Sequence, residues 1–156
     1  MTYVFDTSSF LVLKNFYPSR FPTLWKGIDG LVNAQNIISA REVLKELQSY
    51  AEQDVVLDWA KSNKEIFLIP TSAELQFVSQ IFAVPHFQAI IGQRNILKGT
   101  PVADPFVIAL AKARDGCVVT EETMRPNAAK IPNVCEHFGI EYAKLEGVMN
   151  KEAWTF

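Results

Sequence analysis

Short apolar runs alternate with longer amphipathic segments along this chain of 156 residues. The short runs are rich in β-branched and aromatic residues, and several end at an acidic residue or a proline, which is typical of buried strands. They predict strands at residues 2–6, 36–39, 65–69, 117–120 and 140–144. Strands this short, separated by helical segments, indicate a mainly parallel sheet with helices on both faces.

The segments between the strands carry helix start and stop signals. Ser39 and Glu42 have the spacing of a capping box, so a helix should begin near Ala40. Asp104 is placed to cap another helix that has Pro105 in its first turn. We expect one helix that begins at residue 10 and ends before residue 18, a second that begins after residue 22, and a third that begins near residue 40. Five more are expected over residues 55–61, 72–82, 86–97, 105–113 and 132–138.

Composition narrows the class of protein. With 49% hydrophobic and 21% charged residues, and no repeat, low-complexity tract or linker, the chain predicts one soluble α/β domain over residues 1–156. No apolar run is long enough to cross a bilayer and no leader pattern is present, so we expect no membrane contact and a cytoplasmic location. The net charge of −2 excludes a protein that coats nucleic acid by bulk electrostatics.

Cysteine and histidine offer little for a metal centre or a disulfide framework. Cys117 and Cys135 lie far apart in the sequence, and we expect both to be reduced and buried. His86 and His137 are isolated from each other and from any cysteine pair, so the sequence argues against a zinc site.

Acidic residues fall where a ligand crevice is expected, outside the carboxyl ends of parallel strands. Asp6 ends the first strand, Glu122 follows the strand at 117–120, and Glu46 lies early in the helix after the strand at 36–39. Asp104, at the positive end of its helix, is the fourth. Carboxylates gathered in one crevice resist ionising together unless a cation lies between them, and oxygen ligands select Mg²⁺ or Mn²⁺.

Such a site suits phosphodiester hydrolysis, in which one or two divalent ions activate water and stabilise the leaving oxygen. Two ligand assignments stay open. Glu42 shares a helix face with Glu46, and we favour Glu46 because Glu42 has its expected capping role. Glu121 is the alternative to Glu122.

In sequence order, four motifs resemble those of the PIN-domain nucleases. They are Asp-Thr-Ser-Ser at 6–9, Val-x-x-Glu-Leu at 43–47, Ala-Asp-Pro-Phe-Val-Ile-Ala at 103–109 and Val-Val-Thr-Glu-Glu at 118–122. The tail, Lys-Ile-Pro-Asn-Val-Cys at 130–135 and Phe-Gly-Ile at 138–140, looks like a PIN-like subfamily of uncharacterised prokaryotic proteins. Glu122 departs from the pattern, because most relatives carry the shorter Asp there.

The resemblance implies a PIN-like fold, RNA cleavage, and the role of toxin in a toxin–antitoxin pair with an antitoxin protein as partner. DNA stays open as a substrate, because nothing in the sequence reports recognition of a 2′-hydroxyl. The open alternative is a non-catalytic PIN-like scaffold that binds RNA or a protein. An aspartyl-phosphate phosphatase would need a second acid where Ser8 stands, and a dinucleotide-binding domain would need a glycine-rich turn after the first strand.

Supporting residues can be assigned around the acids. Ser8 is expected to hydrogen-bond either a metal-bound water or the backbone, and Thr120 either to orient Glu122 or to be only a residue of the sheet. Arg125 and Lys45 are candidates to contact substrate phosphate, each with a solvated surface position as the alternative. The apolar segment at 75–91 should be mostly core, with part of it forming a homodimer or antitoxin surface.

Overall fold

β1 (Tyr3–Phe5) is the central strand of a five-stranded sheet in the order β3-β2-β1-β4-β5, in which every neighbouring pair is parallel. The computed structural model describes residues 1–50, 54–91 and 102–156. The other strands are β2 (Ile37–Ala40), β3 (Phe67–Leu68), β4 (Cys117–Val119) and β5 (Glu141–Ala143). The predicted α/β class, with one parallel sheet, is confirmed.

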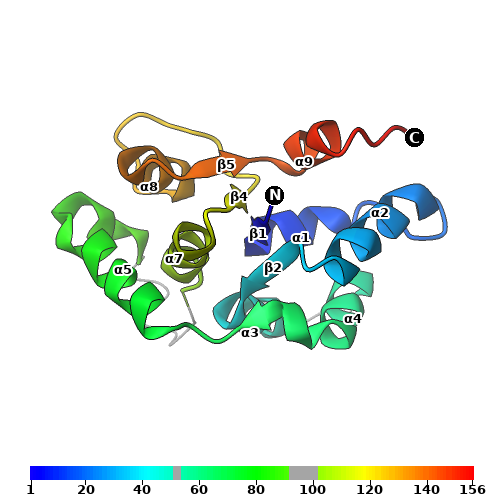
Figure 1. Ribbon diagram of the computed structural model, residues 1–156, viewed down its shortest axis with the longest axis horizontal. Helices are drawn as coiled ribbons and strands as arrows, with labels where there is room; N and C mark the ends of the chain where they lie inside the picture. The colour runs from blue at the N-terminus through cyan, green and yellow to red at the C-terminus, as the bar shows by residue number, and fades with distance from the viewer. Residues whose placement is uncertain (51–53, 92–101) are drawn as a thin grey trace.

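Helices cover both faces of this sheet (Figure 1). The described helices are α1 (Thr7–Leu13), α2 (Pro22–Asn33), α3 (Arg41–Ser49), α4 (Val55–Ser62), α5 (Ser72–Ala83), α7 (Asp104–Arg114), α8 (Ile131–Phe138) and α9 (Leu145–Lys151), with 3₁₀ turns η1 (Lys64–Ile66) and η2 (Pro85–Ile90). In the view of Figure 1, α5, α7 and α8 lie to one side of the strands, and α1, α2 and α4 to the other.

α7 is the helix at the centre of the core. It packs on β1, β2 and β4 with one side and on α5 with another. Residues 107–111 are all buried, at 0–1% exposure. A helix that is apolar all round is stable only when it is covered on several sides, as here. The first residue of α7 is therefore held rigidly against the carboxyl ends of the central strands.

Several sequence predictions need correction. The strand predicted at 65–69 is only two residues long, because its first part forms the 3₁₀ turn η1. The helix predicted over 86–97 begins as the 3₁₀ turn η2, and its remainder from residue 92 lies outside the described residues. α9 was not predicted, although Leu145, Val148 and Met149 have helical spacing.

Two predicted caps are wrong. α3 does begin at Arg41, but its N-cap, Ala40, has no side-chain cap, and Ser39 instead donates to the Phe5 carbonyl across the sheet at 2.6 Å. Asp104 is the first residue of α7 and not its N-cap, which is Ala103. At α3 a tertiary contact of the buried Ser39 hydroxyl replaces the local cap. At α7 the backbone is already helical at Ala103 (φ −83°, ψ −29°), which places Asp104 inside the first turn.

The cysteines behave as predicted. Cys117 and Cys135 are free and buried. Burial raises the pKa of the Cys117 thiol to about 11 and that of Cys135 to about 12, so both are unreactive at neutral pH. No helix in the described ranges is both long and apolar enough to span a membrane.

Candidate functional site

Several hydrogen bonds hold the Asp6 carboxylate in place. It follows β1 at 2% exposure and caps α1, accepting a hydrogen bond from the Ser9 backbone N–H at 2.8 Å. The Ser8 hydroxyl donates to both carboxylate oxygens, at 2.8 and 2.9 Å, and the Thr120 hydroxyl donates to Oδ2 at 2.6 Å. Burial raises the pKa of Asp6 although these hydrogen bonds oppose the shift.

Glu46 reaches the same region from α3. Its Oε2 accepts a hydrogen bond from the Thr7 hydroxyl, next to Asp6, and its Oε1 accepts one from the Ala103 backbone N–H at 2.9 Å, next to Asp104. Burial raises the pKa of Glu46, the hydrogen bonds oppose the shift, and the charge of Asp6 adds to it. Glu46 therefore ties the starts of α1 and α7 to α3.

Asp104, at the start of α7, carries the strongest mutual repulsion. Its pKa is raised well above the ordinary value, first by burial and then by the charges of Glu122, Asp6 and Glu46. The charge of Lys130 opposes that shift. Sequence reasoning missed Lys130, whose only signal was its position directly before a helix.

Glu122 completes the group from the segment after β4. Its Oε2 accepts a hydrogen bond from the Ile131 backbone N–H at 2.9 Å, at the start of α8, while its own backbone N–H donates to Thr120 Oγ1 at 3.2 Å. Burial raises its pKa, and the charge of Asp6 adds to the effect. Thr120 thus holds the Asp6 side chain and the Glu122 backbone together.

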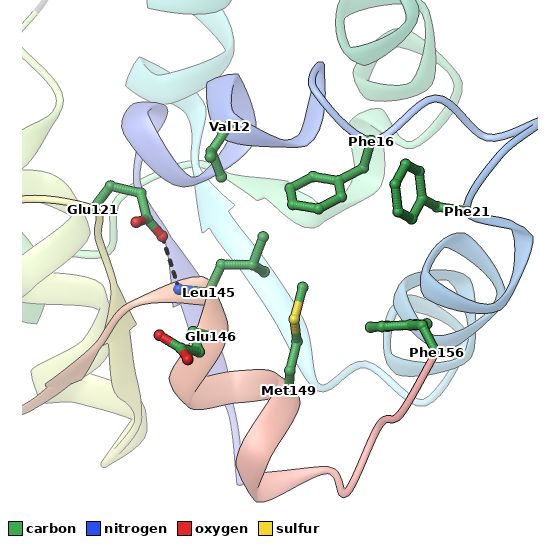
Figure 2. Close-up of a pocket in the computed structure, with 8 residues that line it drawn as sticks. All are labelled: Val12, Phe16, Phe21, Glu121, Leu145, Glu146, Met149 and Phe156. Atoms are coloured by element: carbon green, nitrogen blue, oxygen red, sulfur yellow. Dashed lines mark hydrogen bonds between the residues drawn. The ribbon is translucent and has the colours of Figure 1, made fainter.

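The two alternative ligands lie differently. The Glu121 side chain points to the start of α9, where its Oε1 accepts a hydrogen bond from the Leu145 backbone N–H at 2.8 Å (Figure 2). Glu42 is 5% exposed and paired with Arg41 through Oε1. Its buried Oε2 has no hydrogen-bond partner among the described residues, so Glu42 lacks the capping role expected of it.

Asp6, Glu46, Asp104 and Glu122 form what we call the acid cluster. They come from four separate segments, and burial raises the pKa of each. The charge of Asp6 adds to the rise at Glu46, Asp104 and Glu122. No group of three or more Asp, Glu, His or Cys side chains within the described residues is already arranged to hold a metal ion. Both Glu46 carboxylate oxygens accept hydrogen bonds from protein donors in this geometry.

The cationic residues predicted to bind substrate are at the surface. Lys45 and Arg125 are both exposed. The ion pairs found among the described residues involve neither of them.

Comparison with known proteins gives the fold and the family. No curated protein matches the sequence. VapBC2 from Rickettsia felis, in a crystal structure with a DNA fragment from their promoter, aligns with 92% of this chain and 98% of its own at 14% identity and a TM-score of 0.50. PAE2754 from Pyrobaculum aerophilum aligns with 89% of this chain and 97% of its own at 11% identity and a TM-score of 0.40.

The likeness to VapBC2 concerns the fold, which is PIN-like, as the sequence motifs predicted. A family model described as "Domain of unknown function (DUF4411)" matches residues 3–156, nearly the whole chain. The protein is therefore a member of the DUF4411 family.

Proposed function

We propose that the protein is a metal-dependent endoribonuclease that hydrolyses RNA phosphodiester bonds as the toxin of a prokaryotic toxin–antitoxin pair. The observation that carries the proposal is the acid cluster. Four carboxylates from separate segments of the chain lie close enough that the charges of Asp6, Glu46 and Glu122 raise the pKa of Asp104, and the charge of Asp6 raises those of Glu46 and Glu122. Like charges gathered in this way lower the stability of the fold unless a cation lies between them. Clusters of this kind therefore occur mainly at functional sites.

The donor set fits a hard divalent ion. Asp6, Glu46, Asp104 and Glu122 present only carboxylate oxygens, the ligands that suit Mg²⁺ and Mn²⁺. When bound, such an ion would lower the pKa of a water molecule and stabilise charge on the leaving oxygen. Hydrogen bonds from Ser8 and Thr120 orient Asp6 in advance, which reduces the ordering that binding requires.

The surrounding residues have separate roles in this proposal. Lys130 reduces the negative potential that a phosphate would meet on approach. Exposed Arg125 and Lys45 contact backbone phosphates on either side of the scissile bond. Glu42 and Glu121 are not assigned as ligands, because one is paired with Arg41 and the other is hydrogen-bonded to the start of α9.

Cleavage of a labelled single-stranded RNA in Mn²⁺ or Mg²⁺ tests the proposal. We expect cleavage that EDTA abolishes and that Asp6→Asn reduces by at least about 100-fold, since loss of groups that merely support a metal ligand already costs 10–100-fold. A DNA strand of the same sequence tells whether the 2′-hydroxyl is required.

Asp54→Asn is the matched control for that variant. Asp54 caps α4 by accepting from the Leu57 N–H at 2.8 Å, the same bond that Asp6 makes at α1, but it lies outside the acid cluster. It should retain full cleavage. Cleavage that survives Asp6→Asn would come from a contaminant.

The second candidate is a PIN-like scaffold that binds RNA or a protein without cutting. The observation in its favour is that both Glu46 oxygens already accept hydrogen bonds from Thr7 and Ala103, so coordination requires at least one of these bonds to be given up. A scaffold would bind RNA equally with and without EDTA and leave it intact.

The partner proposal adds an antitoxin and a homodimer. The predicted apolar segment is mostly core, since Phe77, Ile81 and Phe87 are buried, but Leu75 on α5 is 48% exposed. We expect light scattering at micromolar concentration to report a dimer, and Leu75→Glu to shift it towards monomer. Gln80→Glu, an exposed change on the same helix, should leave the dimer intact. A monomeric wild type would contradict the homodimer.

A further inference from the structure

An apolar slot of about 310 Å³ opens beside the acid cluster, on the far side of Glu121. Its lining comes from α1, the loop after it, the segment after β4, α9 and the C-terminal tail, and consists of Val12, Phe16, Phe21, Glu121, Leu145, Glu146, Met149 and Phe156. Figure 2 shows Val12, Phe16 and Phe21 on one side, Leu145, Met149 and Phe156 on the other, and the carboxylates of Glu121 and Glu146 both at the left-hand end.

Both walls of the slot are fixed by packing. Phe16 and Phe21 meet edge to face, with ring centroids 5.2 Å apart. On the other side Trp154 packs so closely on α2 that a Cβ at Gly27 would lie 2.6 Å from its ring, and only glycine permits this approach. That contact anchors the tail and places Phe156 at the slot.

A short chain of hydrogen bonds connects the slot to the acid cluster. The Glu121 backbone N–H donates to Ser8 Oγ at 3.0 Å, and the Ser8 hydroxyl donates to Asp6. Glu122, a member of the acid cluster, is the next residue along the chain. A phosphate at the acid cluster would therefore have the slot within reach of its own nucleotide or the next one.

We propose that this slot takes an unpaired base of the RNA substrate and prefers guanine. The inference rests on the proposed function, because it assumes RNA at the acid cluster. Unpaired bases are commonly recognised by stacking on aromatic side chains together with hydrogen bonds to their polar edges. Two facing apolar walls fit a flat ring, and a pocket near 300 Å³ is large enough for one.

The preference for guanine follows from the acidic end. Ionised carboxylates only accept hydrogen bonds, and Glu121 already uses Oε1 on the Leu145 N–H. Glu121 Oε2 and the exposed Glu146 therefore accept from the base. Guanine presents two adjacent donors, N1–H and the 2-amino group, along one edge, whereas adenine, cytosine and uracil each present one donor group there.

Binding, measured separately from cleavage, tests the proposal. Short labelled oligouridines with one central G, A or C are titrated by fluorescence anisotropy in Ca²⁺, and a gel confirms that the RNA stays intact. We expect the G oligomer to bind tightest, Phe156→Ala to weaken its binding about tenfold, and Glu146→Gln to remove the preference for G. Tyr17→Ala is the matched control, because Tyr17 is 63% exposed and Phe156 64%, and Tyr17 does not line the slot.

The results separate this proposal from the nuclease proposal. Equal binding by Phe156→Ala and Tyr17→Ala overturns the slot even if the wild type cleaves RNA. Slot-dependent binding without any cleavage supports the slot and counts against the nuclease. A wild type that binds no RNA, or binds all oligomers alike, overturns the guanine-binding slot. Thermal unfolding of each variant confirms that it is folded, and Met149→Ala provides a second probe of the same wall.

Discussion

Asp104→Asn is expected to abolish RNA cleavage and, in EDTA, to make the protein more stable than the wild type. Burial and the charges of Glu122, Asp6 and Glu46 raise the pKa of Asp104 well above its usual value. At neutral pH its ionised form is therefore disfavoured in the folded state. The neutral amide removes both the desolvation of a charge and the repulsion, and each kcal/mol of relief raises Tm by about 2–4 °C in a domain of this size.

The sign of the pH dependence agrees with this expectation. The pKa of Asp104 is higher in the folded protein than in the unfolded chain. The folded protein therefore keeps the Asp104 proton up to a higher pH than the unfolded chain does. The stabilising effect of that proton is complete below the unfolded pKa, about 3.9, and is lost as pH rises through the folded value. The Tm advantage of Asp104→Asn should therefore be larger at pH 7 than at pH 4.

Opposite changes in activity and stability distinguish a functional acid from a structural one. Replacing a carboxylate that only stabilises the fold would lower both the cleavage rate and the Tm of the protein. Asp104→Asn should instead lower the cleavage rate by at least about 100-fold and raise the Tm. Asp115→Asn is the control at the other end of α7, since Asp115 is exposed and has a left-handed backbone, φ 49°, that Asn tolerates. A lower Tm for Asp104→Asn in EDTA would contradict the repulsion described above.

Mn²⁺ is expected to raise the Tm of the wild type by about 5–10 °C at pH 7.5. An ion at a hundred times its Kd stabilises the folded state by roughly 2.7 kcal/mol, provided that it does not bind the unfolded chain. The gain should shrink at pH 5.5, because the raised pKa values of Asp6, Glu46, Asp104 and Glu122 let protons compete with the ion. Differential scanning fluorimetry with and without EDTA measures both effects.

Variants locate the ion. Asp6→Asn and Glu46→Gln should lose most of the Mn²⁺ gain, while Asp54→Asn, which changes only a cap, should keep it. A wild type whose Tm does not rise with Mn²⁺ would contradict the metal assignment and favour the scaffold that binds without cutting. A gain that persists in both acid variants would place the ion elsewhere, and Glu42, with its buried unpartnered Oε2, would be the next residue to test.

The local pattern of apolar and polar residues predicted most of the strands and helices. Asp6 was expected at the end of a strand and the start of a helix, and it lies there. A short β-branched run followed by Thr-Ser-Ser favours a strand that ends where a helix begins. The same holds for β4 and for the start of α7 at Asp104-Pro105. Strand and helix periodicity depends on neighbours in sequence, so the sequence itself contains that information.

Side-chain partners were less predictable where two donors or acceptors competed. Ser39 and Glu42 have capping-box spacing, but the Ser39 hydroxyl lies at 0% exposure beside the Phe5 carbonyl and bonds to it. A buried hydroxyl takes the acceptor that the sheet presents, and strand pairing, not sequence spacing, sets that choice. At the start of α7 a second tertiary contact forms, because the Ala103 N–H donates to Glu46, which lies on α3.

By itself the sequence determined the alternation of strands and helices, the acidic residue types and their positions at strand and helix ends. Only the tertiary structure decided that Glu122 joins the acid cluster while Glu121 turns to α9, and that α1, α9 and the tail enclose an apolar slot. The physical reason is distance along the chain. Local preferences act over a few residues, whereas mutual pKa shifts and shared cavities arise between segments that meet only when the core has packed.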